Sequence, residues 1–141
     1  MLSSVNFTHD TVIADLEAGL GTLTRLGNAQ VDVVLLVVEA TTKSLEVAAR
    51  GADLAREKSL GRLIVIANRV RDEVDADAVR KAFPDDEVIA VPHDPAIVEA
   101  DRHGVAALDA APDAPAVRAI SAMARNLLVM AGHNGSGAAS V

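Results

Sequence analysis

The chain has 141 residues, which is enough for one domain with a hydrophobic core. Half of the residues are hydrophobic, 1% are aromatic and the formal net charge is -7, which argues against binding to nucleic acid or an anionic membrane surface. The absence of cysteine excludes disulfides and thiolate sites, and we find no apolar run of ~18 residues and no secretory leader, so we expect a cytoplasmic protein without a membrane span.

Four short apolar segments are predicted to form strands: residues 12–14, 31–38, 63–67 and 88–91. The segment 12–14 is continuously apolar, as expected for a central strand that is buried on both faces. The segment 31–38 is mostly β-branched and lacks a helical period. Strand–helix alternation predicts right-handed βαβ units, and therefore an α/β fold: a three-layer sandwich with a mostly parallel sheet.

Helices are predicted between these strands. Thr41 or Thr42 can cap a helix that runs to about residue 57. We expect Asp75 to cap a short helix that Pro84 ends. The inward-facing residues of that helix are predicted to be Val79, Ala82 and Phe83. A further short helix is expected over residues 95–100.

The last predicted helix begins at Asp113 and Pro115. Its expected apolar stripe consists of Val117, Ile120, Ser121, Ala124, Leu127, Leu128 and Ala131. Residues 132–141 are rich in Gly, Ser and Ala, and we expect them to be a disordered tail that follows a domain of residues 1–131.

Polar residues follow each predicted strand. Asp15 follows the first, Glu39 and two threonines follow the second, Asn68-Arg69 follows the third and Pro92-His93-Asp94 follows the fourth. In a parallel sheet the carboxyl ends of the strands share one edge, where ligands bind. The pattern therefore indicates a ligand site suited to a nucleotide. Each signal also has a plainer interpretation as a helix cap, a strand end or a solvent-facing turn.

Six short motifs occur in an order that resembles a known family. They are V-I-A-D-L-E-A-G at 12–19, V-D-V-V-L-L-V-V-E-A-T from 31, S-L-E-V-A at 44–48, I-A-N-R-V at 66–70, I-A-V-P-H-D at 89–94 and E-A-D-R-H-G at 99–104. Together they resemble the C-terminal half of a deviant-Walker P-loop ATPase of the MinD/ParA kind. The resemblance is closest to the CooC group of nickel-insertion ATPases.

The resemblance implies a ligand, ATP or ADP with magnesium, and roles for individual residues. Asp15 would order the magnesium ion through water, and the backbone of Gly19 would approach the γ-phosphate. Asn68, followed by Arg69, would read the adenine edge. The loop of Pro92, His93 and Asp94 would pack along the base and ribose. The chemistry agrees, since carboxylates suit magnesium, glycine admits a phosphate and an amide matches adenine.

The sequence has no GxxxxGK[ST] phosphate loop, which members of the resembled family carry. In that fold the strand leading to the loop lies between the strand that ends at Asp15 and the strand that ends at Val38. We therefore expect a partial P-loop fold without this strand. Either the two strands pair directly, or a partner polypeptide fills the slot, or an N-terminal part of the protein is missing.

Two functions follow as hypotheses. The first is the adenine-side portion of a CooC/MinD-like ATPase that does not hydrolyse ATP by itself, and that depends on a homodimer partner or on a completing N-terminal half. The second is a non-catalytic interaction protein derived from this family, which would associate by strand addition at an open sheet edge.

Overall fold

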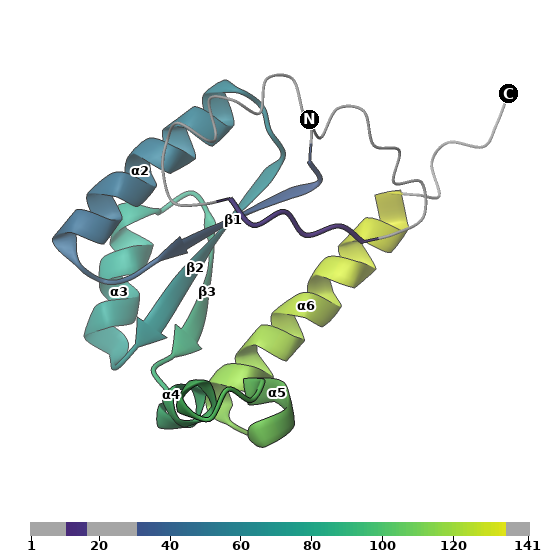
Figure 1. The fold of residues 1–141 in the computed structure, drawn as a ribbon. Helices are drawn as coiled ribbons and strands as arrows, with labels where there is room; N and C mark the ends of the chain where they lie inside the picture. The colour runs from purple at the N-terminus through teal and green to yellow at the C-terminus, as the bar shows by residue number, and fades with distance from the viewer. Residues whose placement is uncertain (1–10, 17–30, 135–141) are drawn as a thin grey trace, which may run out of the picture.

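The computed structural model describes residues 11–16 and 31–134. They form an α/β fold in which helices cover a parallel sheet (Figure 1). The strands are β1 (Val33–Val38), β2 (Arg62–Val70) and β3 (Glu87–Pro92). The helices are α2 (Thr42–Glu57), α3 (Glu73–Ala82), α4 (Pro95–Arg102), α5 (Ala107–Ala110) and α6 (Pro115–Asn134). The sequence did not predict α5, a single turn without a side-chain cap.

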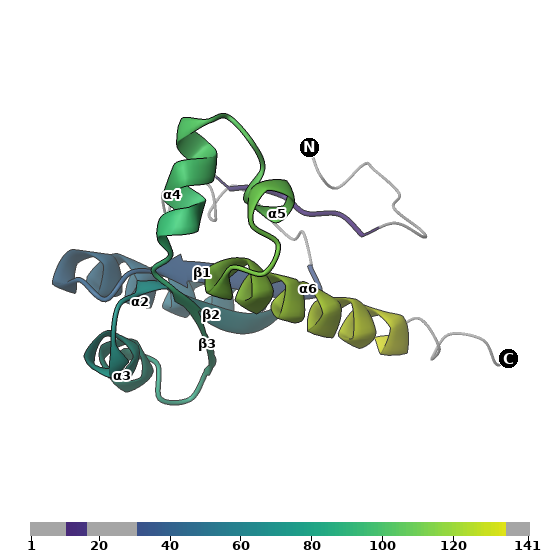
Figure 2. The same ribbon diagram turned by 90° about the horizontal axis from the view of Figure 1, so that it is seen from below.

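The described sheet has three strands, in the order β1-β2-β3, and both pairings are parallel. Helices α2 and α3 connect consecutive strands and pack on one face, around the buried residues Val38, Ala48, Ala52, Val65, Ala67, Val79 and Phe83. Helix α6 packs on the other face, around Ile64, Ile66, Val91 and Ala116. Helices α2 and α3 lie on one side of the strands and α6 on the other, while α4 and α5 lie beyond the carboxyl ends of the strands (Figure 1, Figure 2). The predicted three-layer sandwich with a parallel sheet is confirmed.

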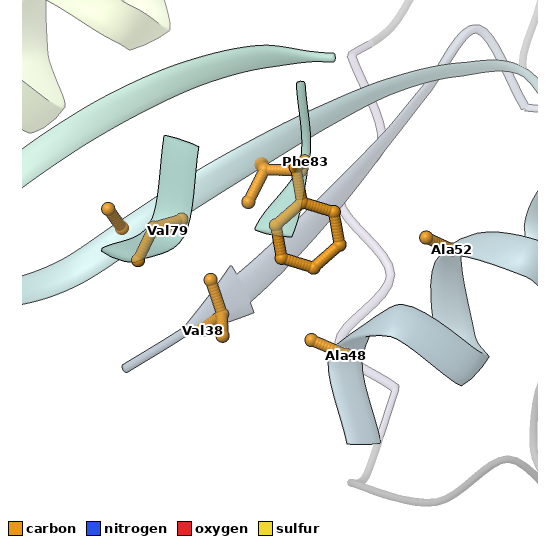
Figure 3. Close-up of a cluster of buried hydrophobic side chains, with 7 residues drawn as sticks. Val38, Ala48, Ala52, Val79 and Phe83 are labelled. Atoms are coloured by element: carbon orange, nitrogen blue, oxygen red, sulfur yellow. The ribbon is translucent and has the colours of Figure 1, made fainter. Parts of the chain in front are cut away.

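Small and branched side chains fill the core, as the composition predicts. Val38, Val79 and Phe83 are each at most 3% exposed. Ala48 and Ala52 of α2 complete this cluster (Figure 3). Because alanine side chains are short, α2 can lie close to the sheet, and Phe83 is the one aromatic side chain in this cluster.

Side-chain caps begin the helices that follow the strands. The Thr41 hydroxyl accepts a hydrogen bond from the Ser44 N–H (3.3 Å), which confirms the predicted cap of α2. Helix α3 is capped by Asp72, which accepts from the Asp75 N–H (3.0 Å), so the predicted cap at Asp75 is wrong. Both residues are aspartates near the start of the helix, and only the backbone distinguishes them. Ala82 is exposed rather than inward-facing, because α3 ends there.

Helix α6 occurs where it was predicted, but its buried face differs from the predicted stripe. Val117 is 5% exposed, whereas Ile120 and Leu128 are 45% and 54% exposed. The residues that pack on the sheet are Ala116, Ala119, Met123 and Leu127. The helix packs mainly on β3, which lies at one side of the described three-stranded sheet. Only a narrow face of the helix is therefore buried. It continues to Asn134, beyond the predicted boundary at residue 131, and residues 135–141 lie outside the described part.

Residues 11–16 do not form the predicted first strand. Val12 and Ile13 are 46% and 88% exposed, and the segment runs as a trace outside the sheet (Figure 1). A strand needs a neighbour for its backbone groups, and in the described part of the chain this segment has none. Direct pairing of residues 12–14 with β1 is therefore wrong, and among the described strands β1 lies at one edge of the sheet. No helix in residues 11–16 and 31–134 has the length and apolarity needed to cross a membrane.

Candidate functional site

Strand register brings the polar strand ends to one edge of the sheet. Val38 lies opposite Ala67, and Ala67 lies opposite Ala90. The chain then continues to Glu39 after β1, to Asn68 near the end of β2, and to His93 after β3. Three of the four predicted groups of polar residues therefore meet at the carboxyl edge, where ligands of parallel sheets bind.

A bulge in β2 shapes this edge. The register between β2 and β3 shifts between Ala67 and Val70, and Arg69 adopts a φ of 56°. A left-handed backbone is uncommon for a residue other than glycine, and costs about 1–2 kcal/mol. Such backbone strain concentrates at functional sites. The bulge adds one residue to β2, and it separates Asn68 and Arg69 from the regular ladder.

Arg69 forms an ion pair across the edge. Its Nη1 lies 3.4 Å from Oε1 of Glu39, and both side chains are about half exposed. An exposed pair of this kind stabilises a fold by only about 0–1 kcal/mol. An anionic ligand can therefore compete with Glu39 for Arg69. Glu39 was not predicted as a site residue, although its position directly after an apolar strand was a usable signal.

Asn68 offers an uncommitted amide. Its side chain is half-buried, and it follows the fully buried Ala67. No group within the described residues forms a hydrogen bond with this side chain. A primary amide has both donors and an acceptor, which is the combination that an adenine edge requires. Asn68 is thus the described residue whose chemistry best fits a base.

The residues after β3 have divided roles. The His93 N–H donates to the Val70 carbonyl (2.8 Å), which extends the β2–β3 ladder past Pro92, and the His93 side chain is exposed. The Asp94 carboxylate accepts two backbone bonds, from the N–H of Ala96 at the start of α4 (3.0 Å) and from the N–H of Ala116 at the start of α6 (3.1 Å). Asp94 therefore holds the loop in place through both of its oxygens.

A second ion pair, between Arg71 and Asp75, lies near the end of β2. Arg71 donates its backbone N–H and two N–H groups of its guanidinium, at Nε and Nη2, to the buried carboxylate of Asp75, at 2.9–3.2 Å. These hydrogen bonds lower the pKa of Asp75 below its ordinary value of 3.8 and raise the pKa of Arg71. Nearby Glu39 also raises the pKa of Arg71. The pair fixes the turn from β2 into α3.

The described residues suit a base better than a triphosphate. Helix N-termini are natural phosphate sites, but carboxylates already cap three of them near this edge: Asp72 on α3, and Asp94 on both α4 and α6. Glu39 adds further negative charge. A phosphate group would therefore need donors other than these helix ends.

Asp15 and Gly19 were predicted to lie near the magnesium ion and the phosphates. The described residues do not place either of them at the carboxyl edge of the sheet. Asp15 is exposed in a segment outside the sheet, and Gly19 lies outside the described residues. Within residues 11–16 and 31–134, no three His, Asp or Glu side chains are grouped as a metal site would require. Magnesium at Asp15 therefore stays a prediction.

Two hollows in the described surface lie away from Asn68. One, of about 170 Å³, lies between α2 and α3 and is lined by Arg56, Phe83 and Asp86 among others. The other, of about 490 Å³, lies between α4 and α5 and is lined mainly by alanines, with Glu99 and His103. Asn68 lines neither of these hollows and lies instead at the open carboxyl edge of the sheet.

Two known proteins are similar to part of this chain, and one of them is described as ATP-binding. No family model matches the chain. The carbon monoxide dehydrogenase accessory protein CooC of Rhodospirillum rubrum is 32% identical over 104 residues, which cover 73% of this chain and 40% of that protein. An uncharacterized ATP-binding protein of Methanocaldococcus jannaschii is 34% identical over 96 residues, which cover 65% of this chain and 37% of that protein. The chain thus spans about two fifths of the length of these relatives, and the similarities support a relationship with CooC-like ATPases.

Proposed function

We propose that the chain is the adenine-side portion of a CooC/MinD-like ATPase, which binds ATP or ADP but does not hydrolyse ATP by itself. The observation that supports this most is the uncommitted, half-buried amide of Asn68 at the carboxyl edge of a parallel sheet. Similarity to an ATP-binding protein supports the choice of nucleotide.

In this proposal each residue has a defined part. Asn68 reads the adenine edge, Arg69 exchanges Glu39 for an anionic group of the ligand, and Pro92 and His93 lie along the base and ribose. Asp94 positions that loop through its two helix caps. Asp15 and Gly19 are assigned to the magnesium and phosphate end. The remaining phosphate ligands would come from residues beyond the described part, from a second copy or from another polypeptide.

Isothermal titration with ADP, and with ATP plus magnesium, tests this assignment. We expect binding that Asn68→Ala weakens by at least about tenfold, because two directional hydrogen bonds are worth about 1.4 kcal/mol or more. The matched control is Asn126→Ala, which removes an exposed asparagine on α6 and should leave affinity unchanged.

The competing results are distinct. Equal affinity of the Asn68→Ala and Asn126→Ala variants would remove the base role of Asn68. No heat of binding by a folded sample would reject nucleotide binding by this chain. Release of inorganic phosphate from ATP above the buffer rate would reject the claim that the chain does not hydrolyse ATP alone.

A further inference from the structure

Glu39 lies beside Asn68 at the carboxyl edge, and its backbone is held by the start of α2. The β1–β2 register places Glu39 next to Asn68, one residue past the last paired position of β1, and neighbouring strands lie about 4.8 Å apart. The Glu39 N–H donates to Ser44 Oγ (3.0 Å), and the Glu39 carbonyl accepts from the Thr41 N–H (2.8 Å). Both backbone groups of Glu39 are therefore fixed before any ligand binds.

The Glu39 carboxylate has one weak partner within the described residues. Its Oε1 lies 3.4 Å from Nη1 of Arg69, and no described group forms a hydrogen bond with its Oε2. Both side chains are about half exposed, so this pair adds little to stability. In the proposed function Arg69 leaves Glu39 for an anionic group of the ligand. The carboxylate then keeps its charge at the edge, where hydrogen-bond donors of the ligand can replace the lost pair.

An adenine nucleotide carries few hydrogen-bond donors. They are the amino group of the base and the 2′- and 3′-hydroxyls of the ribose, because the phosphate oxygens and the remaining ring nitrogens are acceptors. The amino group belongs to Asn68 in the proposed function, which leaves the two hydroxyls for Glu39. A carboxylate accepts through two oxygens, and two adjacent hydroxyls match this arrangement.

Charge around the edge also places the ribose at the end of β1. The N-termini of α3, α4 and α6 are occupied by the carboxylates of Asp72 and Asp94. The first turn of α2 has no acidic residue and contains the exposed Lys43. A nucleotide whose base lies at Asn68 therefore meets the least repulsion when its phosphates extend toward α2. Because the ribose joins the base to the phosphates, it would then lie over Glu39.

We propose that Glu39 selects the ribose: its carboxylate accepts the 2′- and 3′-hydroxyls, so that the site prefers ribonucleotides to deoxyribonucleotides. This inference rests on the proposed function, since it requires that the chain binds an adenine nucleotide. Arg69 passes from Glu39 to an anionic group, and the hydroxyls take its place on the carboxylate, so the exchange leaves neither charge without a partner. In dinucleotide-binding α/β folds a carboxylate also recognises the ribose hydroxyls.

Isothermal titration with ADP, 2′-deoxy-ADP and 3′-deoxy-ADP tests this role. We expect the full chain to bind ADP at least about tenfold more tightly than either analogue, because each analogue lacks one donor to a charged acceptor. In Glu39→Ala this preference should fall to within about threefold. The matched control is Glu46→Ala, which removes an exposed glutamate of α2 and should keep the preference. Circular dichroism establishes that the variants are folded.

Two further variants sharpen the assignment. Glu39→Gln keeps the length of the side chain but loses its charge, so its preference for ADP should be smaller than that of the parent chain, and it replaces Glu39→Ala if that variant does not fold. Asn68→Ala acts on the base and not on the ribose. It should therefore weaken the binding of ADP and of both analogues by the same factor.

Failure of the ribose role can be distinguished from failure of the proposed function. Equal affinity of the parent chain for ADP and both analogues would reject the role of Glu39 and leave nucleotide binding intact. An undiminished preference in both Glu39 variants would also reject it, since another group would then contact the hydroxyls. No heat of binding with ADP from a folded sample would reject nucleotide binding and the ribose role together.

Discussion

Replacing Asp94 with alanine should destabilise the fold through two helices at once. One carboxylate oxygen accepts the Ala96 N–H at the start of α4, and the other accepts the Ala116 N–H at the start of α6. A lost N-cap costs about 1 kcal/mol, so we expect Asp94→Ala to lower the free energy of unfolding by about 2 kcal/mol. For a domain of this size, that corresponds to a fall in melting temperature of about 8 °C.

Urea unfolding followed by circular dichroism at 222 nm measures this loss, because the chain has no Trp or Tyr for intrinsic fluorescence. Asp94→Asn keeps one carbonyl oxygen and should lose about half as much, about 1 kcal/mol. Asp101→Ala, on the exposed side of α4, should stay within about 0.5 kcal/mol of the parent chain. If Asp94→Ala were no less stable than Asp101→Ala, the double-cap argument would be refuted.

Two further predictions concern stability. An alanine Cβ at Gly61 would lie 2.2 Å from the Val31 carbonyl oxygen, so Gly61→Ala should cost more than about 2 kcal/mol in urea unfolding. Gly104→Ala, where φ is 63° and the added Cβ has no neighbour within 4 Å, should cost only about 1–2 kcal/mol, and an equal cost at both sites would contradict the steric argument. Because Arg71 lowers the pKa of Asp75, that carboxylate stabilises the fold above its ordinary pKa of 3.8, and the stabilisation is lost as the pH falls through the lowered pKa. Unfolding free energies from pH 7 to pH 3 should therefore decline more steeply below about pH 4 in the parent chain than in Asp75→Asn, and parallel curves would remove Asp75 from the pH response.

Elements with local signals could be predicted from sequence. The β-branched run that becomes β1 and the cap at Thr41 depend on neighbours in the chain, and both occur in the structure. The carboxyl edge could also be predicted, because parallel strands must end on the same side. Asn68 and His93 both lie at that edge.

The features that could not be predicted from the sequence depend on contacts between residues that are far apart in the chain. Residues 12–14 have the composition of a buried strand, but strand formation requires a neighbouring strand that local sequence does not supply. Asp94 bonds to Ala116, a residue 22 positions away, so its second helix cap has no local pattern. The left-handed backbone of Arg69 follows from the bulge against β3, and arginine gives no hint of it. The exposed part of the α6 stripe depends on how many strands lie beneath that helix.

The uncharged run of β1 also affects how the protein behaves in solution. Six consecutive valines and leucines, on a strand that pairs with only one neighbour within the described residues, are a short, proline-free segment of the kind that stacks into cross-β assemblies. When this edge is uncovered, in a cell or during purification, it can pair with other chains. The rate of aggregation then rises with protein concentration. Substitution of Val37, which is 61% exposed, by lysine should therefore make concentrated samples easier to keep in solution.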